Sequence, residues 1–246
     1  MSLSGELIFY THDPYGELRV LDDGVTRTLS FGAENEQSAC LKQNPAMLMF
    51  EYTQTMLLSL LFVEPRKILC LGLGAGSLIT VLHKHFKACK FTIVELRQAV
   101  IDIAESYFYL PTGKRIQKHC LDAKDFIEQD TGHYDLIFSD IYTAEGLAEL
   151  QLQSKFLYQT AARLKPDGVL VMNCWCEHQH DQALLDILKR LFHSLYACPT
   201  GDGNWIVFAS QRFFEVSPKM LREKAENLSP RLGFSLERHL KRLEKI

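Results

Sequence analysis

The stretch Lys67-Ile68-Leu69-Cys70-Leu71-Gly72-Leu73-Gly74-Ala75-Gly76-Ser77-Leu78 decides the fold. A run of apolar, strand-forming residues ends in a glycine-rich turn, and the turn opens into a segment with helical apolar periodicity. Glycines adopt backbone conformations that a Cβ forbids, and they let the chain pass close to a ligand. The helix that follows offers free N–H groups and the positive end of its dipole. The pattern predicts a cradle for a nucleotide or nucleoside.

The spacing of the glycines narrows the class of ligand. They stand at Gly72, Gly74 and Gly76, whereas the dinucleotide fingerprint requires Gly or Ala where Ser77 stands, and no P-loop Lys-Ser/Thr follows. Glu95 ends the next apolar segment, where an acid usually accepts hydrogen bonds from ribose hydroxyls. These features favour a nucleoside site over the alternative of a tight strand–helix turn without a ligand.

Composition sets the broad class of the protein. The chain has 246 residues, 47% of them hydrophobic and 23% charged, which fits one large globular domain with a small appendage. The net charge of −3 makes no electrostatic case for a nucleic-acid partner, and no apolar run is long enough for a membrane span. Seven scattered cysteines and an amino-terminal segment without a signal-peptide layout predict a cytoplasmic protein.

The order of the segments predicts the architecture. Strands and helices alternate from Lys67 onward, which is typical of an α/β, Rossmann-like, doubly wound and mostly parallel sheet. We expect strands near 67–72, 90–95, 115–120, 134–139 and 168–173, and helices near 76–87, 97–108, 123–129, 153–164 and 180–193. Segments 194–199 and 205–209 flank a tight turn and predict a terminal antiparallel hairpin.

The remaining segments divide the chain into three regions. Residues 1–44 form a small N-terminal β-sheet region, with three short strands between 6 and 32 and an irregular segment after them. Residues 45–212 form the Rossmann-like nucleoside-binding domain, which begins with one buried helix over 46–62. Residues 213–246 form a helical extension, expected as two amphipathic helices on either side of Ser229-Pro230.

Acid or amide side chains recur where the predicted parallel strands end. They are Glu95, Asp122, Asp140 and Asn173, and ligands of such sheets bind beyond the carboxyl ends of the strands. A single acid at a strand end is explained by a solvated loop. Acid or amide side chains at the ends of four strands favour a binding site. We expect these side chains to face the same ligand as the glycine turn.

From about Leu7 to Ala209 the residues resemble the spermidine synthase (polyamine aminopropyltransferase) family, which is built on the class I S-adenosylmethionine methyltransferase fold. The resemblance lies in the Gly72 turn, Val94-Glu95, Leu121-Asp122-Ala123, Asp140 and the closing hairpin. It implies an S-adenosyl donor, intact or decarboxylated, and a homodimer. It also implies that Glu95 holds the ribose hydroxyls, that Asp122 holds the adenine amino group, with Ala123 beside it in the donor site, and that Gln37 touches the sulfur-bearing end. Glu51 resembles the glutamate of the family's Tyr-His-Glu motif and is expected to contact substrate.

The departures from the family concentrate in the polyamine half of the site. The aspartate that holds the donor's amine is replaced by Ala75, and the second aspartate after strand four is replaced by Thr143. Met49 and Phe50 stand where the family has tyrosine and histidine. A protonated polyamine needs carboxylates for its ammonium groups. The nucleoside half is therefore intact, while the acceptor is not defined by the resemblance.

Chemistry at a sulfonium centre requires alignment and desolvation more than acid catalysis, because the sulfonium is already a good leaving group. Asp140 is the candidate for contacting an acceptor amine, with backbone capping as its alternative role. Tyr142 is a candidate for orienting the acceptor, and Trp175 for closing over the nucleoside. The segment Cys174–His180 holds two cysteines and two histidines, but its spacing is unusual for zinc, and we expect no metal.

Three functions remain open from the sequence. The first is transfer of an aminopropyl or methyl group from an S-adenosyl donor to an amine or other small acceptor. The second is a non-catalytic nucleoside-binding homologue, consistent with Ala75 and Thr143. The third, a nicotinamide-dependent dehydrogenase, is disfavoured by Ser77 and by the antiparallel hairpin.

Overall fold

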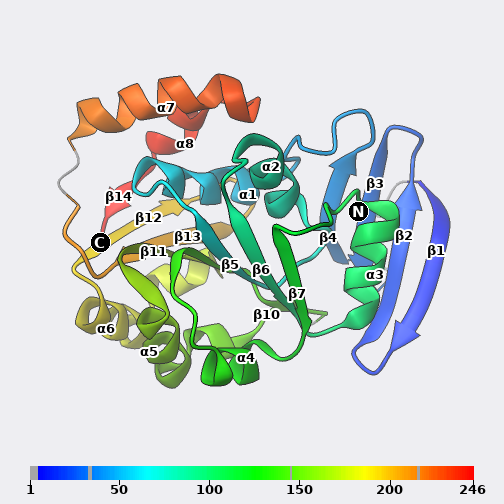
Figure 1. Ribbon diagram of the computed structural model, residues 1–246, viewed down its shortest axis with the longest axis horizontal. Helices are drawn as coiled ribbons and strands as arrows, with labels where there is room; N and C mark the ends of the chain where they lie inside the picture. The colour runs from blue at the N-terminus through cyan, green and yellow to red at the C-terminus, as the bar shows by residue number, and fades with distance from the viewer. Residues whose placement is uncertain (1–4, 33–34, 145, 215–216) are drawn as a thin grey trace.

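The computed structural model describes residues 5–32, 35–144, 146–214 and 217–246. A large sheet is covered by helices on both faces, and a four-stranded antiparallel sheet lies beside it, at the right of Figure 1. This arrangement confirms the predicted α/β, Rossmann-like fold with a small N-terminal sheet and a terminal antiparallel hairpin.

The large sheet has a parallel half and an antiparallel half. Its strands in spatial order are β14 (Glu244–Lys245), β12 (Ser194–Pro199), β13 (Asn204–Ser210), β11 (Leu164–Trp175), β8 (Tyr134–Ser139), β5 (Lys67–Leu71), β6 (Lys90–Glu95) and β7 (Ile116–Cys120). Strands β11, β8, β5, β6 and β7 run parallel, and β13, β12 and β14 are added antiparallel. The chain leaves β5 toward β6 and returns on its other side as β8, and a crevice opens at such a switch point.

Both faces of the sheet are buried, because its central strands are apolar on both sides. In β5, Ile68 and Cys70 contact one helical layer, and Leu69 and Leu71 contact the other. The first layer contains α1 (Glu51–Met56), the 3₁₀ helix η1 (Leu57–Leu61), α2 (Ser77–His85), α7 (Pro218–Leu232) and α8 (Leu236–Leu240). The second contains α4 (Ala123–Gln129), α5 (Ser154–Ala162) and α6 (Gln182–Leu191), drawn below the sheet in Figure 1.

The small sheet is attached to the large one through a helix. Its strands are β1 (Glu6–Asp13), β2 (Gly16–Asp22), β3 (Thr26–Phe31) and β4 (Asn35–Leu41), and the linking helix is α3 (Gln98–Tyr107). Leu18 and Leu29 of the sheet share an apolar cluster with Val100 of the helix. Arg97, which is buried, forms a 2.9 Å ion pair with Asp13. The ion pair and the cluster hold the small sheet beside the carboxyl end of β6.

Strand β4 corrects the expectation of an irregular segment over 32–45, of which residues 33–34 lie outside the described residues. Its backbone pairs with β3 from Thr26↔Leu41 to Phe31↔Asn35. The strand is polar because Glu36, Gln37 and Ser38 line a cavity instead of a core. A cavity-facing strand of this kind lacks the apolar alternation by which strands are recognised in a sequence.

The helix expected over 46–62 begins later and changes type. Residues 46–50 are not helical, α1 starts at Glu51, and the chain tightens into a 3₁₀ helix at Leu57. Leu48 forms an isolated bridge with Cys40, and its carbonyl accepts a 2.8 Å hydrogen bond from Gln54 Nε2. The apolar residues before Glu51 therefore lie in a turn and a short extended segment, which periodicity alone does not separate from helix.

Helix α7 runs through Pro230, where the sequence predicted a break. The proline lies in the last turn before Gly233, whose φ of +82° ends the helix. Ser229 supports this end, since its hydroxyl donates to the Ala225 carbonyl at 2.6 Å and accepts from Leu236 N at 2.9 Å. A proline so near a helix end removes only one hydrogen bond.

Four short elements complete the described chain: β9 (Tyr142–Thr143), β10 (Gly146–Leu147) and the 3₁₀ helices η2 (Glu149–Leu152) and η3 (Cys176–His180). Within the described ranges, no helix is long and apolar enough to cross a membrane.

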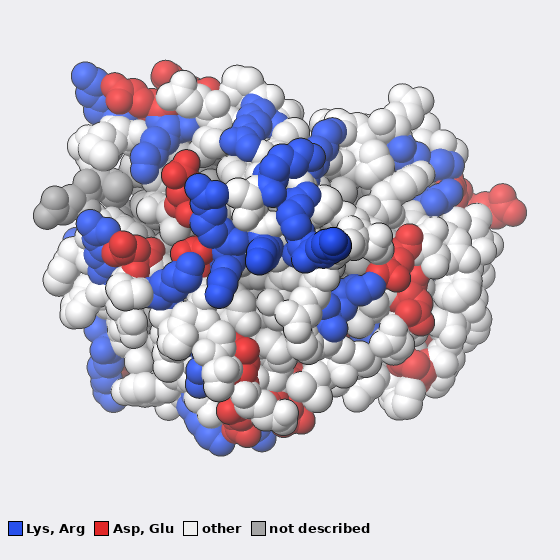
Figure 2. All heavy atoms as spheres, viewed as in Figure 1, with Lys and Arg blue, Asp and Glu red and all other residues white. Residues whose placement is uncertain are grey.

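Charge is segregated over the surface in spite of the small net charge. Figure 2 shows lysine and arginine side chains gathered over the middle of the face on which β5, β6 and β7 lie in Figure 1. Lys67 and Lys90, which open β5 and β6, are register partners at the amino ends of these strands. The opposite, carboxyl ends of the same strands carry the acids described next.

Candidate functional site

A cavity of about 1020 Å³ opens at the carboxyl ends of β5, β6 and β8. It is lined by all but one of the residues that the sequence suggested for the site: Gln37, Gly72, Gly74, Gly76, Glu95, Asp122, Ala123, Asp140, Tyr142 and Trp175. Its volume suits a nucleoside together with a small second substrate. The structure thus brings these residues together, and their individual roles remain predictions.

The glycine turn is required by the protein's own packing. Gly72, Gly74 and Gly76 have φ angles of +90°, +53° and +78°. A Cβ on Gly72 would lie 2.1 Å from the carbonyl oxygen of Asp140, so β5 and β8 meet here without room for a side chain. Gly76 is the N-cap of α2, whose first residues also line the cavity. The turn therefore presents backbone to the cavity and holds Asp140 next to it.

Glu95 is held in place by backbone donors at the end of β6. Its Oε2 accepts a hydrogen bond from Leu73 N at 3.1 Å, and its Oε1 accepts one from Arg97 N at 3.0 Å. Burial raises the pKa of this carboxyl above its ordinary value. The side chain lines the cavity, and a carboxylate fixed in this way suits hydrogen bonds from a pair of ribose hydroxyls.

Asp122 is the N-cap of α4. Its Oδ1 accepts a 2.7 Å hydrogen bond from Lys124 N, which leaves Oδ2 for a ligand. Ala123 follows it on the cavity wall, where a small apolar residue leaves space for a flat ring. Gln37 faces the cavity from β4, on the small sheet.

Asp140 lies directly after β8, beside the Gly72 turn. Its Oδ1 accepts a 2.8 Å hydrogen bond from Asn173 Nδ2. Burial raises the pKa of Asp140 to about 6, and the hydrogen bond from Asn173 opposes this shift. A carboxyl group with such a pKa is ionised at neutral pH and can accept a proton at the cavity wall.

Two tyrosines lie near Asp140 at the same end of the cavity. Tyr142 Oη accepts a 3.3 Å hydrogen bond from Asn204 Nδ2, and the same amide nitrogen donates to Asn173 Oδ1 at 2.9 Å. Burial raises the pKa of both Tyr142 and Tyr52, and the negative charge of Asp140 adds to each shift. Both phenols stay protonated at neutral pH and can donate hydrogen bonds to an acceptor molecule.

Trp175 forms one side of the cavity at the end where Asp140 and the two tyrosines lie. Its ring centroid lies 6.3 Å from that of Tyr142, and the side chain is 37% exposed. A Cβ on Gly146, whose φ is +121°, would lie 2.2 Å from the indole ring. The β9–β10 hairpin therefore packs its glycine against the tryptophan, and together they form the rim of the cavity.

The cavity is acidic. The part of its lining that the structure describes carries five carboxylates: Glu36, Glu95, Asp122, Asp140 and Asp202. Among the described lining residues, Arg97 is the single lysine or arginine, and its guanidinium is paired with Asp13. Such a cavity attracts cations such as a sulfonium or an ammonium and disfavours phosphate groups.

Glu51 does not line the cavity. Its Oε2 accepts a 2.9 Å hydrogen bond from Gly201 N, and its Oε1 pairs with Arg242. Burial acts to raise the pKa of this carboxyl, but the Arg242 guanidinium and the Gly201 N–H outweigh it and hold the pKa below its usual value. The expected contact of Glu51 with substrate is therefore not part of this geometry.

Sequence reasoning missed Ser38, Tyr52 and Asp202 as cavity residues. Ser38 lies on the unrecognised strand β4, and Asp202 lies in a turn whose distance from Asp140 along the chain hides their proximity. Tyr52 follows Glu51 directly, and its position beside the motif residue was the one available signal. In the described part of the chain, no group of three or more His, Cys, Asp or Glu side chains could hold a metal ion, the Cys174–His180 segment included.

Comparison with known proteins relates the chain to two kinds of transferase. The family model for the spermine/spermidine synthase domain matches residues 49–222. The polyamine aminopropyltransferase of Neisseria meningitidis serogroup A is 27% identical over 236 residues, which cover 92% of this chain and 88% of the relative.

Solved structures with the same fold include both kinds. Human methyltransferase-like protein 13 in complex with SAH aligns with a TM-score of 0.69 and 25% identity, over 75% of this chain and 93% of that one. The spermidine synthase from Thermotoga maritima aligns with a TM-score of 0.71 and 16% identity, over 96% of this chain and 83% of that one, which shows a shared fold.

Proposed function

Because the chain belongs to the spermine/spermidine synthase family, we propose that it transfers an alkyl group from an S-adenosyl sulfonium donor to an amine acceptor. The observation that carries this proposal is the acidic cavity at the carboxyl ends of the parallel strands. Both reactants are cationic or become so, and five carboxylates with one neutralised arginine favour them over anionic nucleotides. Glu95 and Asp122 would hold the nucleoside, and Asp140 and Tyr142 would face the acceptor.

The proposed step is a direct substitution at carbon. The lone pair of the acceptor nitrogen attacks the carbon bonded to the sulfonium sulfur, the carbon–sulfur bond breaks, and its electron pair leaves with sulfur as a neutral thioether. The proton that the nitrogen must lose passes to the carboxylate of Asp140, which lies beside the glycine turn. Tyr142 and Tyr52 would orient the nitrogen through their hydroxyl groups.

Calorimetric titration and product analysis test this proposal together. The purified protein is titrated with S-adenosylmethionine, its decarboxylated form and methylthioadenosine, each with and without putrescine, and products are identified by mass spectrometry. Binding of at least one donor, with turnover onto an amine, is the expected result. Failure of all three nucleosides to bind would sink the proposal and leave the shared fold. Binding without turnover on a panel of amines would instead support a non-catalytic homologue.

Methyl transfer from intact S-adenosylmethionine is a second candidate, supported by the residues around Ala75. Ala75 is 1% exposed, and its N–H donates to Ser38 Oγ at 3.1 Å. Ser38 lines the cavity, and its own proton is available to an oxygen acceptor such as a carboxylate. The acid that the family places at position 75 would repel the carboxylate of the intact donor, and here that repulsion is absent. Preference for the intact donor in the same titration would decide for methyl transfer.

Assembly and location complete the proposal. Large apolar side chains are exposed on the small sheet, among them Ile8 and Tyr10 on the edge strand β1, and we expect this sheet to form the interface of a homodimer. All seven cysteines are unpaired, and five of them are buried, which suits the reducing conditions of the cytoplasm.

A further inference from the structure

The amino end of helix α1 has an unusual cap. Its N-cap residue, Phe50, has no polar side chain, and the N–H of Tyr52 donates to Asp202 Oδ2 at 3.3 Å. A carboxylate from the β12–β13 turn thus occupies the position that an N-cap aspartate would fill in the helix's own sequence. The turn and the helix start are both parts of the cavity wall, since Tyr52 and Asp202 line it.

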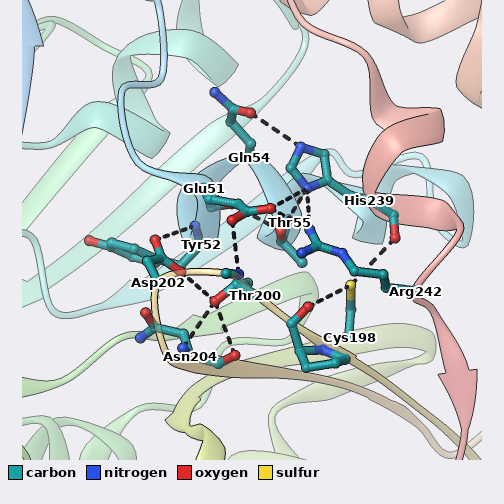
Figure 3. Close-up of polar contacts among 12 residues, drawn as sticks. Glu51, Tyr52, Gln54, Thr55, Cys198, Thr200, Asp202, Asn204, His239 and Arg242 are labelled. Atoms are coloured by element: carbon teal, nitrogen blue, oxygen red, sulfur yellow. Dashed lines mark hydrogen bonds and ion pairs between the residues drawn. The ribbon is translucent and has the colours of Figure 1, made fainter.

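A second hydrogen bond runs in the opposite direction between the same two elements. Glu51 Oε2, on the helix, accepts from Gly201 N, on the turn, at 2.9 Å. Figure 3 shows the Glu51 carboxylate lying between the turn and the C-terminal segment. The two hydrogen bonds run in opposite directions and together fix the turn against the helix.

The C-terminal segment contacts this pair of hydrogen bonds through Glu51. Arg242 pairs with Glu51 Oε1, and the same guanidinium nitrogen lies 3.3 Å from His239 Nδ1. His239 is 1% exposed, and its Nε2 lies 3.2 Å from Gln54 Oε1, which makes Nε2 the protonated nitrogen. The Gln54 amide nitrogen already donates to the Leu48 carbonyl, which fixes the orientation of that amide. Arg242 is therefore aimed at Glu51 by a buried, neutral histidine.

Hydrogen bonds continue from the turn to the acid of the proposed reaction. Thr200 donates to Asp202, and its Oγ1 accepts from Asn204 N at 3.0 Å. Asn204 donates to Asn173 at 2.9 Å, and Asn173 donates to Asp140 at 2.8 Å. The turn to which Glu51 is hydrogen-bonded thus leads directly into Asn204, which lies at the acceptor end of the cavity.

From this connection we infer that Arg242 and Glu51 are positioning residues, which hold the β12–β13 turn so that Asp202 and Asn204 shape the acceptor end of the cavity. The inference concerns the acceptor end of the site in the proposed function and rests on it. The donor end, at Gly72–Gly76 and Glu95, makes none of the contacts described in this network. Loss of Arg242 should therefore disturb acceptor use and leave donor binding intact.

Hydrogen–deuterium exchange of the full chain tests the structural half without any substrate. In Arg242→Ala, peptides covering 50–56 and 199–204 should exchange about tenfold faster or more, while the peptide covering 72–77 stays unchanged. Arg242→Lys, which keeps the charge, should restore most of the protection. Arg238→Ala is the matched control, because Arg238 is an exposed cation on the same segment. Faster exchange confined to 236–246 in Arg242→Ala would overturn the inference.

Kinetics test the functional half with putrescine as the acceptor and whichever donor the wild type turns over. In Arg242→Ala and Glu51→Gln, the KM for putrescine should rise about tenfold, with the donor dissociation constant changed less than about twofold. The double variant should be no worse than the worse single one, because the two residues act as a pair. Equal effects on donor and acceptor, or an effect no larger than that of Arg238→Ala, would contradict positioning. A wild type that turns over no donor with putrescine or with the panel of amines rejects the proposed function, and the exchange experiment then decides the role of Arg242 in holding the turn.

Discussion

Asn173 donates a 2.8 Å hydrogen bond to Asp140 across the adjacent parallel strands β11 and β8. The amide of Asn173 is 1% exposed, and its oxygen in turn accepts from Asn204 on β13. Asp140 is thereby held by one neutral donor in a cavity with other acids, which leaves it ready to accept a proton. The hydrogen bond from Asn204 to Asn173 joins the parallel half of the sheet, which binds nucleosides in related folds, to the antiparallel half.

Asp140→Asn should lower turnover about 10²- to 10⁴-fold, because the acceptor nitrogen loses its proton acceptor. The dissociation constant of the donor should change less than about threefold, since Glu95 and Asp122 are untouched. Steady-state kinetics with the acceptor found active for the wild type checks the first point, and calorimetry checks the second. Asp125→Asn, an exposed acid on α4, is the control. Undiminished turnover would remove Asp140 from the reaction.

The same variant should be more stable than the wild type at neutral pH. Burial raises the pKa of Asp140 from 3.8 to about 6, so this group's contribution to stability is fully present below pH 3.8 and is lost as the pH rises through about 6. The rise of the pKa from 3.8 to about 6 corresponds to a loss of about 3 kcal/mol at most. At pH 7.5 the free energy of unfolding, measured in urea, should therefore be about 1–3 kcal/mol larger for Asp140→Asn than for the wild type. This difference should vanish near pH 4. A gain in stability that does not change with pH would show that ionisation of Asp140 is not its cause.

Ala75→Asp should shift donor preference toward decarboxylated S-adenosylmethionine by about tenfold or more. By the family resemblance, the new carboxylate would take the place of the acid that attracts the donor's ammonium, and it would repel the carboxylate of the intact form. Calorimetric titration with both donors measures the ratio of affinities. Ala75→Asn has the same shape without the charge and should leave the ratio near the wild-type value. If both variants change the ratio alike, shape rather than charge decides at this position.

Gly72→Ala should destabilise the protein much more than Gly113→Ala. Both glycines have positive φ angles, +90° and +109°, so each substitution carries a backbone strain of about 1–2 kcal/mol. At Gly72 the new Cβ would also lie 2.1 Å from the Asp140 carbonyl oxygen, whereas at Gly113 it meets nothing within 4 Å. Urea unfolding should show a further loss of at least about 2 kcal/mol at Gly72. Equal losses of unfolding free energy in the two variants would mean that the chain after β8 moves away from the new Cβ at little cost.

Ile8→Glu combined with Tyr10→Glu should convert a homodimer into a monomer, because the charges would be buried in the expected interface. Light scattering coupled to size-exclusion chromatography measures the mass. Tyr158→Glu is the control, since Tyr158 is 54% exposed on α5, on the other side of the large sheet from α1 and α7. A monomeric wild type, or a dimer that survives the double substitution, would place the small sheet outside any interface.

Local patterns were enough for the parallel half of the molecule. Strand β5, the glycine turn and α2 are adjacent in the sequence, and each has its own periodicity or φ requirement. The acids Glu95, Asp122 and Asp140 were recognised because parallel strands place their carboxyl ends at one edge, whatever the loops between them do. The same reasoning failed for β4, whose polar residues face a cavity.

The sequence by itself therefore determined the α/β fold, the strand-end residues that line the cavity and the family resemblance, because short-range periodicity and strand order carry them. The tertiary structure alone decided that Glu51 turns away from the cavity toward Arg242, and that Asp202 and Tyr52 join its wall. Those contacts join residues about 150 to 190 positions apart, as Gly201 and Arg242 are from Glu51. No local propensity encodes such a contact, since it forms only when burial of the two helical layers brings the C-terminal segment onto α1.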